Sequence, residues 1–385
     1  MVFFSKKLVF YMVVLLCAIL FLFVGFWIIT RGTNPFAHQG QESPEIVTAR
    51  VVEILSHTEN KFQVDQNTWV VFIDIGLIAE ITTRHRRGEQ VSISYSATVT
   101  PDSTGERIRV GNRIFLIAHP THGFIFFDFM RLHNIVIMGV VFLGLILIFG
   151  RTKGLNAIIT LGLTCVAIFF VFIPAILAGY SVLFAVFLLG AYVIVFTLLL
   201  VIGANKKSLA AMVGCLGGLI VSGTLMLFIS RLTALTGAQD ADLRQLFLFP
   251  IPINPVDVIF AGVIIGAVGA IMDVAMSISS AMWEIRIAGE GTDVSALFRA
   301  GINIGKDIMG TMLNTLILAY IGSSLAMILV STGDSRSLIQ LLNSEIIATE
   351  ILRALVGSFG MLSTIPLTAA VSAWLYKKGQ QVLTI

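Results

Sequence analysis

Long runs of apolar residues alternate with short polar connections over most of the chain. A helix that crosses a hydrocarbon core of about 30 Å needs about 20 residues, and eight runs come close to or exceed this length. They cover residues 8–29, 134–150, 155–175, 181–203, 208–229, 256–282, 307–330 and 350–375. The pattern therefore predicts an α-helical polytopic membrane protein with about eight transmembrane helices.

Between residues 31 and 131 the pattern changes to short runs in which polar and apolar residues alternate. This period of two, with many β-branched residues, is typical of strands that have one buried face. We predict a small mostly-β domain, an OB-like barrel, after the first helix. The predicted strands include Ile46–Val52, Val70–Ile75, Val91–Tyr95, Ile108–Val110 and Ile114–Leu116.

Three parts of the chain follow from these two patterns. Residues 1–30 form an N-terminal transmembrane anchor, residues 31–131 the β domain, and residues 132–385 a membrane domain of about seven helices. Lys6 and Lys7 precede the first apolar run as they would in a secretory signal. However, the run is longer than the apolar core of a signal, and no small-x-small cleavage pattern closes it. We therefore predict that the first helix is retained.

Composition agrees with a protein whose solvent is the bilayer. Of 385 residues, 57% are hydrophobic and 12% are charged, and the mean hydropathy is +0.94. A soluble domain of this composition would expose a large apolar surface to water. The net charge of +3 is small and dispersed, so we expect no nucleic-acid partner.

Lysine and arginine concentrate in alternate connections. By the positive-inside rule these connections are cytoplasmic, which places both termini in the cytoplasm and residues 31–131 outside the membrane. The basic residues in question are Lys6, Lys7, Arg151, Lys153, Lys206, Lys207, Arg286, Arg299, Lys306, Lys377 and Lys378. The segment Asp240–Pro250 is then extracytoplasmic and is predicted to be a short interfacial helix. The connection Ile285–Gly305 is predicted to be a solvated cytoplasmic loop, and the alternative is that it caps a cytoplasmic mouth.

The sixth apolar run carries small and polar residues at spacings of three and four, which place them on one helix face. The outer half of this face is rich in glycine, which lets two helix backbones approach closely. Asp273 lies about 27 Å along the helix from Pro255, in the cytoplasmic leaflet. The stripe consists of Gly262, Gly266, Gly269, Asp273, Ser277, Ser280 and Glu284.

The seventh run carries a second stripe, Asn303, Asp307, Gly310, Thr311 and Asn314. A carboxylate at membrane depth costs a few kcal/mol (about 3) unless it is protonated, paired or wetted. We therefore predict that the two stripes face each other or a water-filled cavity and form an intramembrane polar pathway. The alternative is structural: Asp273 is a neutral acid, hydrogen-bonded to serine and asparagine, that locks a helix pair. Gly262, Gly266, Gly269 and Gly310 are the predicted helix-packing glycines.

Several other classes of site are not expected. Cys17, Cys165 and Cys215 all lie in apolar runs, so no disulfide framework is predicted. His119 and His122 flank a proline and lack a further ligand, so we predict no metal site. The chain has no nucleotide-binding loop, zinc-protease motif or nucleophile elbow, so no cofactor and no enzymatic activity are expected. Packing and kink positions are predicted at Gly214, Gly217, Gly218, Gly357, Gly360 and Pro366. Glu350 and Arg353 are interpreted as an interfacial pair.

Two long motifs resemble the YibE/F family of bacterial membrane proteins. The first is Gly266–Ser280, GAVGAIMDVAMSISS, followed by Glu284, and the second is Gly301–Ser324, GINIGKDIMGTMLNTLILAYIGSS. The resemblance extends over nearly the whole chain. It implies a bacterial multi-spanning membrane protein with an exposed β domain, and it implies no substrate, cofactor or reaction.

Together these observations favour a membrane transporter or permease, with proton or cation coupling through the polar stripes. The alternative is a non-transporting scaffold or sensor that presents the β domain to an extracytoplasmic protein or polymer. The expected partners are the lipid bilayer and a small ion or small-molecule substrate, and the sequence leaves an oligomer open. The expected location is the bacterial cell membrane.

Overall fold

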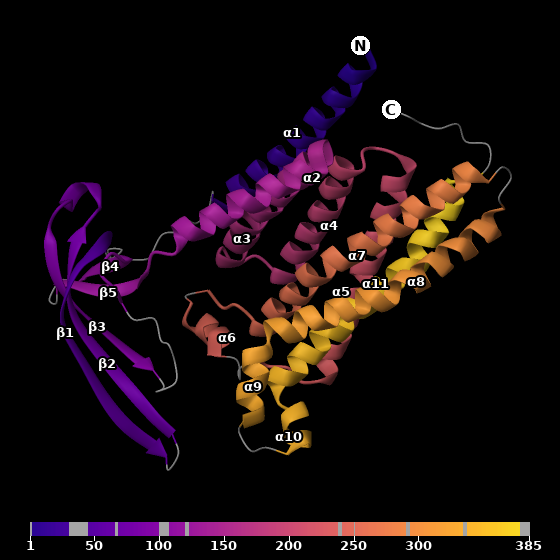
Figure 1. The fold of residues 1–385 in the computed structure, drawn as a ribbon. Coiled ribbons are helices and arrows are strands. Elements are labelled where there is room, and N and C mark those ends of the chain that lie inside the picture. Colours follow the sequence, from indigo (N-terminus) through magenta and orange to yellow (C-terminus); the bar gives the residue numbers. More distant parts are fainter. Residues whose placement is uncertain are drawn as a thin grey trace. The chain divides into compact units, whose positions relative to one another are not determined.

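The computed structural model describes residues 2–30, 45–65, 68–99, 108–119, 123–237, 241–249, 251–289, 293–333 and 337–377. The chain divides into two compact units (Figure 1). One unit comprises Met1–Phe36 with Ile146–Ile385 and is helical. The other comprises Ala37–Leu145 and contains the β-sheet.

The β unit is one antiparallel sheet of five strands in the order β3-β2-β1-β4-β5. Val47, Ala49 and Val51 alternate on β1 and are buried, as a strand with one buried face requires. Leu77 on β2 and Leu116 on β4 complete this core from the neighbouring strands. The strands are β1 (Ile46–Asp65), β2 (Thr68–Ile81), β3 (Gln90–Val99), β4 (Arg113–His119) and β5 (Gly123–Phe129), with a short 3-10 helix, η1 (Arg84–Arg86), between β2 and β3.

Two predictions for this unit need correction. Ile108–Val110 is not a strand, because the chain turns there through Gly111, whose φ of +93° favours glycine. The strand Gly123–Phe129 was not predicted, although its alternating burial is that of a half-buried strand. The segments predicted around residues 46, 70, 91 and 114 all lie in strands.

The sheet does not close into a barrel among the described residues. No ladder of hydrogen bonds joins the edge strands β3 and β5. Their side chains do meet, because the Tyr95 ring lies 4.8 Å from that of Phe126 and 6.2 Å from that of Phe129. The open sheet corrects the predicted closed barrel, and the OB-like identity stays a prediction.

The helical unit contains seven of the eight segments that were predicted to span the membrane, and of the second one, 134–150, it contains the part from Ile146 on. Its helices are α1 (Val2–Thr30), α2 (Leu132–Val166, from Ile146 on), the π-helical η2 (Ala167–Phe172), α3 (Ile173–Leu177), α4 (Val182–Val201), α5 (Lys206–Leu232), α6 (Ala241–Gln245), the 3-10 helix η3 (Leu246–Leu248), α7 (Pro255–Ala288), α8 (Val294–Ser323), α9 (Leu325–Gly333), α10 (Leu338–Leu342) and α11 (Glu345–Leu375). The short α6 agrees with the helix predicted in the segment 240–250.

Six described helices are long and apolar enough to cross a membrane, or seven if α8 and α9 count as one bent span, instead of the predicted eight. The difference arises because the second and third predicted spans lie in one helical element, Leu132–Leu177. This element is broken at Arg151, whose backbone is not helical. The α-carbon of Gly154 packs against the carbonyl of Ile146, although residues eight apart in a straight helix are about 12 Å apart. The chain therefore turns back sharply at Arg151.

α8 begins earlier than the sequence predicted and ends at a bend. It starts at Val294, so most of the predicted loop Ile285–Gly305 is helical. Asp293 caps it by accepting a hydrogen bond from the Val294 amide. The polar residues of this first part occupy the exposed side of an amphipathic helix, which explains the error. At Ser324 the chain bends by 61° into α9, so the predicted span 307–330 is not one continuous helix.

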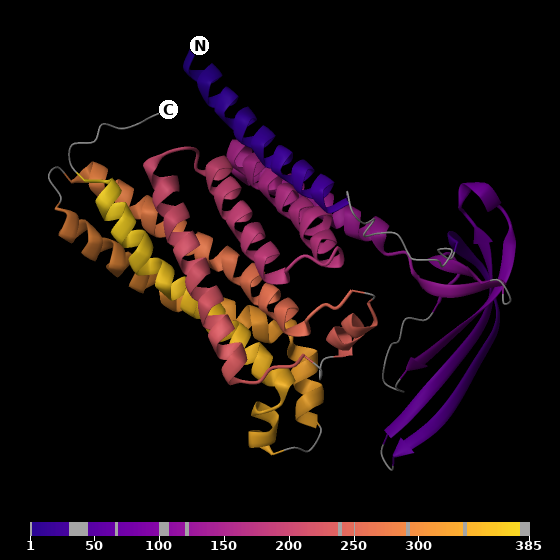
Figure 2. The same cartoon turned by 180° about the vertical axis from the view of Figure 1, so that it is seen from behind.

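The centre of the helical unit is formed by α5, α7 and α11, which pack against one another (Figure 2). Glycines bring α5 and α11 together: Gly214 lies against Thr368, and Gly218 lies against Thr364. This agrees with the predicted packing role of the Gly214 and Gly360 regions. α4 packs against α5 and α7, and α8 packs against α7 and α11.

Candidate functional site

The polar stripe predicted from the sixth apolar run lies on the exposed side of α7. Ser280 is partly exposed, and the other members of the stripe are exposed, namely Gly262, Gly266, Gly269, Asp273, Ser277 and Glu284. The opposite side of the same helix is fully buried in the unit, at Ile264, Ile271 and Ile278 among others. α7 begins at Pro255 because Asn254 caps it and a proline is well tolerated in the first turn.

The second stripe lies on the exposed side of α8. All of its members are exposed, namely Asn303, Asp307, Gly310, Thr311 and Asn314. Leu297, Gly301 and Gly305, at intervals of four, form the buried side of this helix. The helical spacing read from the sequence therefore identified one face correctly on each helix.

Two close contacts define how α7 and α8 run past each other. Gly301 lies against the side chain of Met282, and Gly266 lies against the hydroxyl group of Tyr320. Because the earlier residue of α7 meets the later residue of α8, the two helices are antiparallel. The contacts also fix their register.

In this register Asp273 lies at the same level as the second stripe. Asp273 lies nine residues before Met282, and nine residues after its partner Gly301 is residue 310. Asp273 also lies seven residues after Gly266, and seven residues before its partner Tyr320 is residue 313. Asp273 is therefore level with residues 310–313. Thr311 lies in that segment and Asn314 directly follows it. The register supports the predicted equal depth of the two stripes along the helix pair.

Asp273 has no hydrogen-bond or ion-pair partner among the residues that the structure describes. The same holds for Asp307 and Asn314, whereas the Thr311 hydroxyl donates to the carbonyl of Ile308 at 3.0 Å. The hydrogen-bonded helix lock that we considered as an alternative for Asp273 is therefore not formed inside the described part of this chain. That the two stripes face each other stays a prediction.

Glu284 differs from the rest of its stripe because it belongs to a contact between helices. Its carboxylate accepts a hydrogen bond from Lys207 Nζ at 3.0 Å, which joins α7 to the start of α5. Beside it the buried Ser279 hydroxyl lies 2.8 Å from the backbone carbonyl of Lys207 and 2.8 Å from the Tyr376 hydroxyl. Arg286 donates to the backbone carbonyl of Tyr376 at 2.9 Å. These bonds tie the ends of α5, α7 and α11 together.

Of the four predicted packing glycines, only Gly266 makes a close contact inside the described chain, with Tyr320. Around the positions where Gly262, Gly269 and Gly310 would carry a β-carbon, no atom lies within 4 Å. Close packing at these three glycines stays a prediction, and it would require a second molecule.

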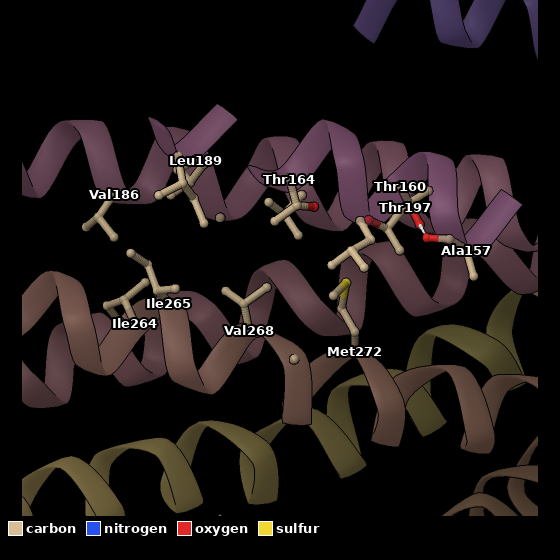
Figure 3. Close-up of a pocket in the computed structure, with 15 residues that line it drawn as sticks. Ala157, Thr160, Thr164, Val186, Leu189, Thr197, Ile264, Ile265, Val268 and Met272 are labelled. Carbon is tan, nitrogen blue, oxygen red and sulfur yellow. Dashed lines mark hydrogen bonds between the residues drawn. The ribbon is translucent and has the colours of Figure 1, made fainter. Parts of the chain in front are cut away.

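A cavity of about 320 Å³ lies between α2, α4 and α7, directly beside the α7 stripe. Gly269 and Met272 line it, and Asp273 is the next residue on α7. Figure 3 shows that the two ends of the cavity differ in polarity. One end is apolar and is lined by Val186, Leu189, Ile264 and Ile265. The other end, near Met272, carries the hydroxyl groups of Thr160 and Thr197.

The threonines of this cavity, Thr160, Thr164 and Thr197, were not among the predicted site residues. Thr160 and Thr164 are four residues apart in the third apolar run, and this spacing puts two hydroxyl groups on one helix face. That signal was present in the sequence, but a threonine in a helix can satisfy its own hydroxyl. Thr160 does so by donating to the carbonyl of Ala157 at 2.9 Å.

No group of three or more histidine, cysteine, aspartate or glutamate side chains gathers as a metal site within the described ranges. His122 of the histidine pair considered above lies outside those ranges.

The profile of the family described as YibE/F-like protein matches residues 138–378, which is more than half of the chain. The chain belongs to the YibE/F family. The matched region of this YibE/F protein contains both polar stripes, the cavity beside them and all of α4 to α11. It leaves out α1 and the β-sheet, so it is narrower than the resemblance drawn from the sequence. Neither the curated proteins nor the solved structures compared with the chain include a match.

Proposed function

We propose that this YibE/F protein is a membrane transporter or permease that couples to protons or cations at Asp273. The observation that carries the proposal is the position of Asp273. It lies on the exposed stripe of α7, next to the hydroxyl-lined end of a cavity and level with residues 310–313 of α8.

Energetics favour water or an ion near this side chain. Asp273 lies 18 residues after Pro255, about 27 Å along the helix, within the length that crosses a hydrocarbon core. An aspartate at the centre of a membrane helix costs about 3 kcal/mol on insertion scales when nothing compensates it. No described side chain of this protein bonds to it. A hydrated pathway that runs along the stripes would remove this cost.

The proposal includes a topology. The break at Arg151 lets the element Leu132–Leu177 supply two spans, because 46 helical residues extend about 69 Å, roughly twice the hydrocarbon thickness. With α8 and α9 as one broken span this gives eight. The alternate basic connections then favour cytoplasmic termini, an extracytoplasmic segment 31–131 and a bacterial cell membrane as the location.

Flux measurements on protein reconstituted in liposomes test the proposal. Imposed gradients of protons, sodium and potassium are compared for the wild type, Asp273→Asn and Asp257→Asn. Asp257 is the matched control because it lies on the same helix, in its first turn. We expect flux in the wild type and in Asp257→Asn, and at least a tenfold loss in Asp273→Asn. Equal flux in all three proteins, or none in any gradient, would contradict ion coupling at Asp273.

A second candidate function is a non-transporting scaffold that presents the β unit to an extracytoplasmic protein or polymer. It is favoured by the open space around Gly262, Gly269 and Gly310, which a partner helix would fill. Exposed apolar side chains on the β1–β2 hairpin, such as Leu55 and Phe62, fit a binding surface. For a scaffold, Asp273→Asn would be nearly silent in any functional readout, because an amide is as small and as polar as a neutral acid.

A further inference from the structure

A second cavity lies at the end of the helical unit where α7 and α11 begin, far along α7 from Asp273. Its volume is about 270 Å³. α11 contributes Glu345, Thr349, Glu350 and Arg353 to its lining. The sequence assigned Glu350 and Arg353 only to an interfacial ion pair.

The ion pair exists but is largely withdrawn from solvent. Arg353 donates through a terminal nitrogen to one carboxylate oxygen of Glu350 at 2.8 Å. The side chains of Glu350 and Arg353 are only 14% and 26% exposed. A comparable pair in the β unit, Asp128 with Arg131 at the same spacing, is 51% exposed on both sides. The position in the cavity, and not the spacing in the sequence, distinguishes the two pairs.

Two atoms of this partly buried pair, one acceptor and one donor, have no partner among the described residues. The second carboxylate oxygen of Glu350 and Nε of Arg353 are both buried and have no hydrogen bond to any described residue. Buried polar groups of native proteins are nearly always satisfied, and charged ones are the most costly to leave alone. The pair therefore needs an additional group that both donates and accepts.

Glu345 does not supply that group, because it is engaged elsewhere. Its carboxylate accepts hydrogen bonds from the Thr236 hydroxyl and from the backbone amides of Thr236 and Gly237. These bonds hold the end of the α5–α6 connection against α11, and Gly237 lines the cavity. Glu345 therefore holds one wall of the cavity in place, at Gly237.

We propose that this cavity binds a small zwitterion with an aliphatic side chain, of the size of a branched-chain amino acid. An ammonium group would donate to Glu350 and a carboxylate would accept from Arg353, and the ligand would bring no net charge into a poorly solvated site. Aliphatic residues, among them Val258, Ile259 and Ile346, form the remaining wall. The volume lies just below the range of drug-sized sites, about 300–1,000 Å³, which fits such a small solute.

The site is independent of ion coupling at Asp273, so it is tested by equilibrium binding and not by flux. Binding of L-valine to the full-length protein in lipid nanodiscs is measured by titration calorimetry. Isobutylamine, which lacks the carboxylate, and isovalerate, which lacks the amine, are the matched probes. We expect L-valine to bind at least tenfold more tightly than either, a difference of about 1.4 kcal/mol.

Variants locate the binding in the cavity. Glu350→Gln and Arg353→Gln are each expected to weaken L-valine binding at least tenfold. Asp128→Asn, which removes the exposed pair of the same spacing, is expected to leave it unchanged. Gly262→Leu fills the cavity without touching its charges and is expected to abolish binding, which keeps the test valid if a charge variant does not fold.

Two sets of results overturn the inference. The first is that L-valine does not bind the wild type at millimolar concentration, which would leave water as the occupant. The second is that L-valine binds no more tightly than isobutylamine or isovalerate, or that its affinity survives both charge substitutions and Gly262→Leu. Either result leaves the proposal for Asp273 untouched, because no residue of the α7 cytoplasmic half is changed.

Discussion

The contact between α5 and α11 at Gly214 permits a quantitative prediction about stability. A β-carbon placed on Gly214 would lie 2.9 Å from Cβ and 3.0 Å from Cα of Thr368, and nearer still to its hydroxyl oxygen. Ordinary contacts of a β-carbon begin at 3.4 Å. A change of the Thr368 rotamer moves neither Cα nor Cβ, so the helices themselves must separate. We therefore expect Gly214→Val to force α5 and α11 apart.

The cost follows from the size of that separation. The helices must move by about half an ångström or more, and a gap of this size forfeits about a quarter of the dispersion energy of each affected contact. Overpacking of a buried site costs about 1–3 kcal/mol. The two methyl groups of valine place Gly214→Val in the upper part of that range, about 2–3 kcal/mol.

Equilibrium unfolding in mixed detergent, followed by the fluorescence of the four tryptophans, measures this loss. Gly162→Val on α2 is the matched control, because no atom lies within 4 Å of the position of its β-carbon. Both substitutions replace glycine by valine in a helix, so their difference isolates the packing term. We expect the control to stay within about 0.5 kcal/mol of the wild type. Equal stability of the two variants would refute the packing argument.

Three further predictions concern other parts of the molecule. Ser279→Ala should lower the free energy of unfolding by about 1–3 kcal/mol, because its buried hydroxyl joins α7 to the ends of α5 and α11. Glu284→Gln should cost less than about 1 kcal/mol, because the ion pair of Glu284 with Lys207 is partly exposed. Asp293→Ala should increase amide exchange in the first turn of α8. Hydrogen bonds from the Ser295 hydroxyl and the Val294 amide lower the pKa of Asp293, so the wild type should show the same fraying only as the pH falls below about 4. Leu77→Ala should cost about 2–5 kcal/mol and expose the β unit to proteases in the full-length chain.

Each of these predictions has its own check. Glu284→Gln destabilising as much as Ser279→Ala would show that the ion pair, and not the buried hydroxyl, holds the three helix ends. The sign for Asp293 follows from its lowered pKa: the stabilising bonds are present above the pKa of the unfolded chain and are lost on acidification. Fraying that sets in at neutral pH would contradict this cap. For the β unit, Leu55→Ala on an exposed position is the control and should leave proteolysis unchanged.

Much of the fold follows from periodicity, because a helix face and a strand face repeat at fixed intervals. The stripes of α7 and α8 were found in this way, and Asp273 and Asn314 lie where the spacing put them. The start of α8 was missed because its exposed side carries charges that a loop also carries. The segment Ile108–Val110 was too short for alternation to separate a strand from a turn.

Sequence could not reveal the two cavities, because they depend on contacts between distant helices. Glu350 with Arg353 and Asp128 with Arg131 have the same spacing, yet only the first pair is withdrawn from water. Their surroundings are formed in part by α6, α7 and the loop at Gly237, none of which is near them in the chain. Likewise Thr197 reaches the Met272 end of its cavity only because α4 packs on α7.

A thiol-accessibility measurement tests most directly whether water reaches the polar stripes at membrane depth. Ser277→Cys and Thr311→Cys are made in a variant whose three native cysteines are replaced. Ile220→Cys on α5 is the control, because Ile220 is 61% exposed on an apolar helix surface. A charged, membrane-impermeant methanethiosulfonate should modify positions 277 and 311 in reconstituted protein at least tenfold faster than position 220. Equal, slow modification at all three positions would contradict a hydrated pathway along α7 and α8.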